Sequence, residues 1–410
     1  MSLDFDPLEF DVISDDFRQN PYLYYEVFRT KAPVCRIKSF GSYWVFSRGL
    51  VKEVVSTRKD IFLKPGKDRS QDPRPFGVAA QFGDGIFFMD PPRHTEVRAM
   101  MNDAFGAAIT DAGQRAAVLA AQLLDAAEPL CDLVKAFANP LTTQVFMDVM
   151  GIPWGDGARP GDGPVVDGWI RQALKAHGHM APLLEKLAGG TATMALRAYF
   201  LALAREPGIK TSAGAPSIMA GMQRQTGCPA SPSAMSPFEV MNTAVQFGLG
   251  GYLSTEFLIT TGVRNLVRTG QWELLKGDRG LLDQAVEEML RYDAPFQMAD
   301  RWVAEPTTLG GVKLEKGDKV TVVYGSANRD RPSSENPDRF DIRRPINKDG
   351  NFGFGLDIHY CIGAPLARTI TKAAINAMLD KCPAPTVIAD DSWLADPYFR
   401  SLEKLVMKLH

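Results

Sequence analysis

The stretch that decides the fold is Phe352-Gly-Phe-Gly-Leu-Asp-Ile-His-Tyr-Cys-Ile-Gly363. Glycines stand before and after Cys361, and an apolar helical stripe of Ile362, Leu366 and Ile370 follows at once. We therefore predict that Cys361 lies in a turn directly before a helix N-terminus. In such a place the helix dipole and the free backbone N–H groups stabilise a thiolate.

A thiolate at this position has two chemical uses. It can ligate a soft metal, for example as the axial ligand of haem iron. It can also act as a nucleophile, which requires a general base nearby. His359 is two residues away and would be a poor geometric partner for that purpose. The other four cysteines, at positions 35, 131, 228 and 382, form no CxxC pair and are interpreted as small buried side chains.

The pattern Phe354-Gly355-x-x-x-His359-x-Cys361-x-Gly363 resembles the haem-binding loop of the cytochrome P450 family. The resemblance implies that Cys361 ligates the iron of haem b and that Phe354 and Gly363 belong to the cofactor-binding loop. The second glycine of the family pattern is replaced here by Asp357. Aspartate tolerates a left-handed backbone better than most residues, so the turn is expected to survive.

Two further segments match the family in its own order. Glu288-Met-Leu-Arg291 resembles the family's Glu-x-x-Arg, in which the two side chains share a helix face and pair. Pro337-Asp-Arg339-Phe340 resembles a Pro-x-Arg-Phe segment whose arginine joins that pair. We interpret this group as structural.

The resemblance also implies four contacts to the haem propionates. The segment from Asp90 to Arg98 resembles the helix that supplies them, and His94 and Arg98 face the same way at spacing i, i+4. Arg301 matches a third donor and His359 a fourth. Buried carboxylates need hydrogen-bonded partners, so four donors around two propionates are physically reasonable.

The length of 410 residues alone predicts two or three domains, with one large domain also possible. The resemblance instead runs from Asn20 to Leu405 and implies one haem-thiolate domain over residues 1–410. We expect a mainly α fold with a small antiparallel β part from residues 33–47 and 301–324 and a C-terminal hairpin. Stretches rich in glycine and proline at 64–85 and 155–163 are interpreted as mobile connections.

One predicted helix, from Pro237 to about Arg268, would be roughly 48 Å long. Gly248, Gly250 and Gly251 each weaken its interior, which indicates either close helix packing or a bulky ligand against the backbone. It resembles the distal helix of the P450 family, where the pattern Ala/Gly-Gly-x-Asp/Glu-Thr relays protons during oxygen activation.

That distal pattern falls on Gly250-Gly251-Tyr-Leu-Ser254, and two of its positions differ. Leu253 replaces the acid and Ser254 the threonine, with Thr255 next. The candidate catalytic residues are Gly250, Gly251, Ser254 and Thr255. Glu256 is a possible substitute acid, although it lies some 60° from Leu253 around the helix.

Aromatic and apolar residues mark the expected substrate pocket, because the segments that carry them border the substrate in the family. They are Phe87, Phe88, Gln246, Phe247, Phe296, Met298 and Phe399, with Phe76 and Phe82 nearby in sequence. They indicate a small apolar or aromatic substrate, to be hydroxylated or O-dealkylated. Such clusters also occur in ordinary protein cores.

The leading hypothesis is a haem-thiolate monooxygenase that takes electrons from a ferredoxin and its reductase. Arg343, Arg344, Arg368 and Lys372 either dock an acidic partner or are simply solvated. Loss of the distal acid leaves peroxide-driven oxygenation, substrate-assisted proton delivery and oxidative coupling open. A non-catalytic haem-thiolate sensor is a further alternative.

The charge balance bears on other partners. Lys and Arg total 46 and Asp and Glu total 48, giving a net charge of −2, so no partnership with nucleic acid or an anionic membrane is expected. The first 16 residues are acidic, which is unlike a secretory signal. We expect a cytoplasmic monomer.

Overall fold

The computed structural model describes residues 10, 12, 14–64, 85–154, 163–177, 183–206, 208–224, 234–330, 335–346, 350–394 and 396–410. Its α-helices are α1 (Asp15–Gln19), α2 (Pro21–Lys31), α3 (Arg48–Lys52), α5 (Arg93–Ala108), α6 (Ala112–Ala126), α7 (Asn139–Met150), α8 (Gly163–His177), α9 (Leu183–Leu203), α10 (Ile218–Arg224), α11 (Pro237–Gly251), α12 (Leu253–Arg268), α13 (Gln271–Gly277), α14 (Leu282–Tyr292), α15 (Tyr324–Asn328) and α16 (Ala364–Lys381).

The strands are short and form three sheets. They are β1 (Val34–Ile37), β2 (Ser42–Val45), β3 (Phe62–Leu63), β4 (Leu130–Asp132), β5 (Met298–Val303), β6 (Thr307–Leu309), β7 (Val312–Leu314), β8 (Lys319–Val323), β9 (Thr386–Trp393) and β10 (Leu402–Lys408). One sheet has the order β1-β2-β8-β5-β3, a second β4-β10-β9, and β6 and β7 form a hairpin.

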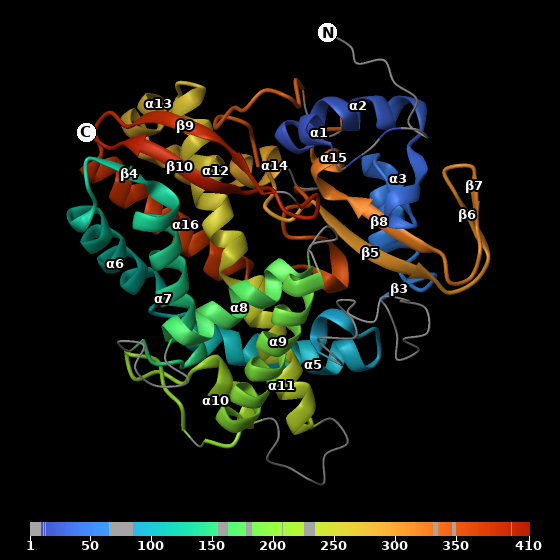
Figure 1. The fold of residues 1–410 in the computed structure, drawn as a ribbon, viewed down its shortest axis with the longest axis horizontal. Coiled ribbons are helices and arrows are strands. Elements are labelled where there is room, and N and C mark those ends of the chain that lie inside the picture. The colour runs from blue at the N-terminus through green and yellow to red at the C-terminus, as the bar shows by residue number, and fades with distance from the viewer. Residues whose placement is uncertain are drawn as a thin grey trace.

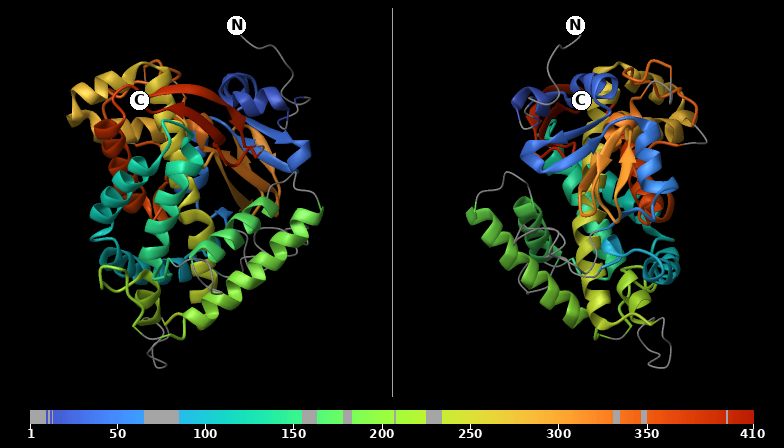
Figure 2. Two further views of the ribbon diagram at one scale, coloured as in Figure 1. Left: turned by 60° about the vertical axis from the view of Figure 1, so that its left-hand side comes forward. Right: turned by 90° about the vertical axis from the view of Figure 1, so that its right-hand side faces the viewer.

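Helices make up most of the molecule, and the five-stranded sheet lies at one side (Figure 1). Helices α11 and α12 run through the middle, while α8 and α9 lie side by side at an edge (Figure 2). The predicted fold class is therefore confirmed. One detail differs, because β2 and β8 pair in parallel. Parallel neighbours need a long crossover, and here most of the chain lies between these two strands.

Local sequence explains several turns and the buried face of α14. Gly310 and Gly311 have φ of 55° and 83° and join β6 to β7, as expected for a tight hairpin turn. Gly317, with φ of 90°, precedes β8. The apolar stripe of α14 is buried, including Val286 and Met289. Residues 65–84 and 155–162 of the expected mobile connections lie outside the described part of the chain.

The long central helix is interrupted, which the sequence pattern did not predict. Ser236 and Glu239 form a capping box at the start of α11, next to Pro237 at the first turn. The helix then ends at Gly251, and Tyr252, with φ of −124°, separates it from α12. Two consecutive glycines favour the break because each lowers helix propensity by about 1 kcal/mol.

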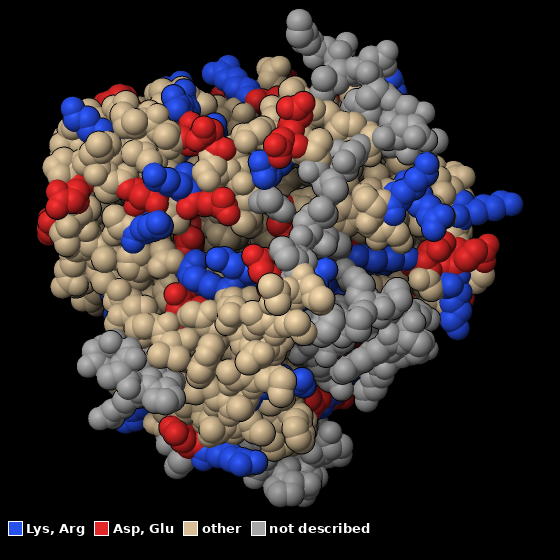
Figure 3. All heavy atoms as spheres, in the orientation of Figure 1, with Lys and Arg blue, Asp and Glu red and all other residues tan. Residues whose placement is uncertain are grey.

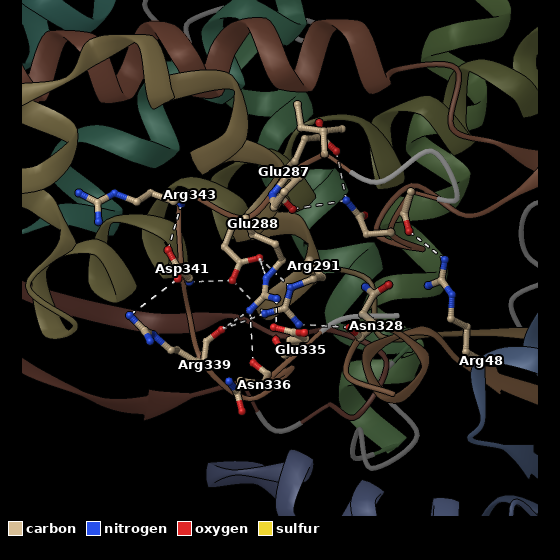
Figure 4. Close-up of a pocket in the computed structure, with 15 residues that line it drawn as sticks. Arg48, Glu287, Glu288, Arg291, Asn328, Glu335, Asn336, Arg339, Asp341 and Arg343 are labelled. Atoms are coloured by element: carbon tan, nitrogen blue, oxygen red, sulfur yellow. Dashed lines mark hydrogen bonds and ion pairs between the residues drawn. The ribbon is translucent and has the colours of Figure 1, made fainter. Parts of the chain in front are cut away.

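The buried Glu288–Arg291 pair forms as predicted, but its third member was assigned wrongly. Arg291 Nε lies 2.7 Å from a Glu288 carboxylate oxygen, and the second cation on that carboxylate is Arg344, at 3.1 Å (Figure 4). The side chain of Arg339 is 71% exposed and points to Asp341 at 3.7 Å. Its backbone carbonyl accepts from both arginines, so the segment joins the group through the main chain.

We expect Arg344 and Arg339 to differ sharply in their effect on stability. Arg344→Ala removes a charged hydrogen bond to a buried carboxylate and should lower the free energy of unfolding by about 2 kcal/mol. Arg339→Ala, at an exposed position, should change it by no more than about 0.5 kcal/mol. Denaturant titration of the two variants beside the parent measures both values. An equal loss in the two variants would contradict the assignment.

Candidate active site

Cys361 lies where the sequence predicts it, in a turn at the start of α16. Its backbone N–H donates to the carbonyl of Phe354 at 2.9 Å, which closes the loop. Gly355 has φ of 73° and Asp357 φ of 58°, so aspartate adopts the left-handed conformation at the position of the missing glycine. Lys59 holds the Asp357 carboxylate at 2.7 Å.

The electrostatics around the Cys361 sulfur work in both directions. Burial raises the pKa of the thiol because it disfavours a charged group. The backbone N–H groups of Gly363 and Ala364 and the charge of Arg98 oppose that effect. A cation bound directly to the sulfur would complete the stabilisation of the thiolate.

Four predicted binding residues converge above this loop. The His94 and His359 rings lie 4.4 Å apart between centroids. Burial and the charges of Arg98 and Lys64 lower the pKa of His94 to about 4. The pKa of His359 is also lowered, by burial and then by Lys64, Arg301, His94 and Arg98. We call Lys64, His94, Arg98, Arg301 and His359 the cation cluster.

The cation cluster is short of negative charge and of hydrogen-bond partners. Among the described residues, His94 Nδ1 and His359 Nε2 are buried without a hydrogen-bond partner. The carboxylate of Asp90 lies 3.9 Å from His359 Nε2 and accepts from the backbone N–H of Lys64. Buried polar groups are nearly always paired, so this arrangement is suited to an anionic ligand.

The glycines of the central helix serve two different purposes. A side chain at Gly251 would overlap the ring of Phe146 in α7, and one at Gly248 would come within 3.0 Å of Ile170 in α8. These two glycines permit close helix packing. At Gly250 the nearest atom would be on the Phe87 ring, 3.8 Å away, which is an ordinary contact.

Comparison of the sequence and fold with known proteins finds matches to one family. A cytochrome P450 family profile matches residues 269–388. The chain is 27% identical to the cytochrome P450 monooxygenase PikC of Streptomyces venezuelae, covering 98% of this chain and 94% of that protein. It is 28% identical to the 6-deoxyerythronolide B hydroxylase of Saccharopolyspora erythraea, covering 97% and 98%. The solved structure of CalO2 superposes with a TM-score of 0.85 at 27% identity, covering 98% and 99%.

The chain belongs to the cytochrome P450 family. As a P450 it binds haem and is an oxygen-using oxidoreductase, which decides against the sensor alternative. Bacterial members of this family typically take small-molecule substrates and electrons from redox partners. No helix in the described ranges is long and apolar enough to cross a membrane.

Haem fits the residues around Cys361. The group carries an iron for a sulfur ligand and two propionate carboxylates for cations and N–H donors. The cation cluster, with its two unpaired imidazole nitrogens, lies beside Cys361 and offers those partners.

Glu256, the possible substitute acid, is engaged by side chains of neighbouring helices. Its carboxylate accepts from Arg171 at 2.8 Å and from Asn139 at 3.1 Å, so it is held by α8 and α7. Ser254, two positions earlier, instead donates its hydroxyl hydrogen to the carbonyl of Gly250 at 3.0 Å. Two positions correspond to about 200° around a helix, which places Ser254 and Glu256 on opposite faces. Thr255 is buried.

Several predicted pocket residues of the P450 meet in space. Phe399 contacts Phe296 edge-on, with centroids 5.4 Å apart, and also contacts Phe257 of α12 at 6.1 Å. Phe257 was not predicted. The Phe87 side chain is 47% exposed beside Gly250, and its backbone N–H donates to Gln246 Oε1 at 2.8 Å.

Other predicted pocket residues lie in hydrophobic cores. Phe247 packs edge-on against Phe105, with centroids 5.1 Å apart, and Phe88 packs against the same core. Met298 is fully buried in the cluster formed by the N-terminal helices and the sheet. Phe76 and Phe82 lie outside the described residues.

Lys64 is the member of the cation cluster that the sequence did not signal. It belongs to no family motif and begins the glycine-rich and proline-rich stretch that we interpreted as a mobile connection. Only the fold brings the end of β3 next to Arg301 and the two histidines.

The two adjacent glycines of α11 provide a matched test of packing. Gly251→Ala should lower the free energy of unfolding by about 1–3 kcal/mol, because the methyl group displaces the buried Phe146 ring. Gly250→Ala should leave it unchanged or raise it by up to about 1 kcal/mol through helix propensity. Denaturant unfolding of both variants checks the difference. Equal stability of the two would argue against the packing role of Gly251.

Proposed function

We propose that Cys361 is the axial ligand of the haem iron and that His94, Arg98, Arg301 and His359 hold the propionates. The observation that carries this proposal is the buried cation cluster, with unpaired imidazole nitrogens, beside a thiol at a helix N-terminus. Phe354 and Gly363 complete the loop, and residues 1–410 act as one haem-thiolate domain.

The haem supplies the redox chemistry for dioxygen activation. The residues around it have separate roles. The N–H groups of Gly363 and Ala364 hold charge on the Cys361 sulfur. Ser254 and Thr255 are the candidate groups for moving protons on α12, where Leu253 has no exchangeable proton. Gly250 leaves room at the helix surface.

We propose a small apolar or aromatic substrate that is hydroxylated or O-dealkylated. Support comes from the aromatic group of Phe257, Phe296 and Phe399, and from the exposed ring of Phe87 beside Gly250. Aromatic side chains bury large apolar area and exclude water from the reacting bond.

The proposed electron donor is a cytoplasmic ferredoxin with its reductase. Of the four basic residues considered for docking, Arg344, Arg368 and Lys372 are paired with Glu288, Glu287 and Asp283. Arg343 is exposed. Basic and acidic side chains are interspersed on the face drawn in Figure 3. We propose weak, salt-sensitive docking that involves the exposed Arg343.

A second candidate function is peroxide-driven oxygenation by the same site. Two observations favour it: Leu253 stands in place of the distal acid, and Glu256 is held on the opposite helix face. Peroxide carries its own protons and depends less on a relay through the protein.

The haem ligand is tested by a pair of cysteine variants. Cys361→Ser should abolish the red-shifted Soret band of the reduced protein under carbon monoxide, since a serine hydroxyl cannot supply thiolate sulfur. Cys382→Ser, at the far end of α16, is the control and should retain the band. Persistence of the band in Cys361→Ser would falsify the ligand assignment.

The missing distal acid is tested by Leu253→Glu, with Leu253→Gln as a control of similar size and no acidic group. A positioned acid contributes roughly 10²- to 10⁴-fold to proton transfer, so Leu253→Glu should raise the fraction of reducing equivalents that reach product. The gain should appear with ferredoxin and not with peroxide. Tight coupling in the parent with substrates that have no polar group would contradict this explanation.

A further inference from the structure

Lys64 is a buried lysine at the end of β3. Its side chain is among the least exposed of the charged residues, at 7%. The backbone N–H donates to Asp90 Oδ2 at 3.0 Å, which fixes the start of the side chain. The ammonium nitrogen lies 5.5 Å from the centroid of the Phe87 ring. Lysine is almost never fully buried unless it is paired.

The charge of Lys64 acts on the same space as the propionate donors. It lowers the pKa of both His94 and His359. Burial, and then the charge of Arg301, lowers the pKa of Lys64 itself. Lys64 therefore lies among cations, and the nearby Asp90 is the carboxylate that offsets part of their charge.

Counting charges shows what the cluster lacks. Among the described residues, and leaving the two imidazoles aside, Lys64, Arg98 and Arg301 contribute three positive charges. Asp90 contributes one negative charge, since Asp300 beside it is paired with Lys319 at 2.7 Å. The difference is two, which equals the charge of two propionates. Without Lys64 the difference would be one, and one carboxylate would lack compensation.

We propose that Lys64 is a further haem-binding residue. Its ammonium group, together with Arg98 and Arg301, balances the negative charges of the two propionates and of Asp90. The inference rests on the proposed function, because it needs the cation cluster to hold haem. Lys64 differs from the other members in coming from outside every motif in the sequence.

The rate at which the protein loses haem tests this role of Lys64 without any measurement of enzyme activity. Lys64→Met removes the charge and keeps the chain length, Lys64→Arg keeps the charge, and Lys52→Met on the exposed face of α3 is the control. Transfer of haem from the ferric protein to excess apomyoglobin should be roughly ten-fold faster in Lys64→Met, as expected for losing a charged hydrogen bond. Lys64→Arg and Lys52→Met should stay within about two-fold of the parent.

The double variant Lys64→Met, Asp90→Asn separates charge from packing. Removing Asp90 restores the difference of two charges, so haem transfer should return to within about three-fold of the parent. Failure of Asp90→Asn to rescue would overturn the charge argument. Should the methionine variant not fold, as judged by far-ultraviolet circular dichroism, Lys64→Gln takes its place in both measurements.

An unchanged rate of haem transfer in Lys64→Met would also overturn the proposal. If that variant then binds benzoate more weakly than the parent, Lys64 is assigned to a substrate carboxylate instead. Failure of the proposed function itself is recognised separately, because the parent would then show no thiolate-type Soret band.

Discussion

The burial of like charges beside one thiol is the constraint on which the rest of the structure depends. The cation cluster draws Lys64 from β3, His94 and Arg98 from α5, Arg301 from β5 and His359 from the loop before α16. Separate parts of the chain must meet for these side chains to lie together, and the mutual repulsion of Lys64, Arg98 and Arg301 opposes that meeting. An anionic ligand reverses the sign of the interaction, so haem binding and folding stabilise one another.

The surrounding fold holds those segments at the required places with ion pairs of its own. Arg93, next to His94, pairs with Glu239 at 2.8 Å, and Glu239 also completes the capping box at the start of α11. The Glu239 carboxylate thus fixes the start of α11 and also the start of α5, which carries His94 and Arg98. A change at Glu239 would act on the site through position rather than through contact.

Local features of this site could be predicted from sequence, and long-range ones could not. The turn at Cys361 follows from glycines and an adjacent helical stripe, and Asp357 adopts the backbone that its residue type tolerates. Lys64 could not be found, because one lysine after a short strand carries no pattern. Arg344 was missed for a related reason: Arg339 and Arg344 lie five residues apart, and only tertiary packing decides which guanidinium reaches Glu288.

The central helix illustrates how one local break redistributes acidic groups. At the break, the Tyr252 hydroxyl donates to Asp167, which also accepts from Arg171, and Arg171 in turn donates to Glu256. Burial raises the pKa of Glu256, whereas Arg171 and Asn139 oppose that rise. Asp167 and Glu256 thereby help to pack α8 against α12, on the face of α12 opposite Ser254. Glu256 is the only acidic residue of the described helix α12, so the proposed proton route to the Ser254 face runs through Ser254, Thr255, water or a polar group of the substrate.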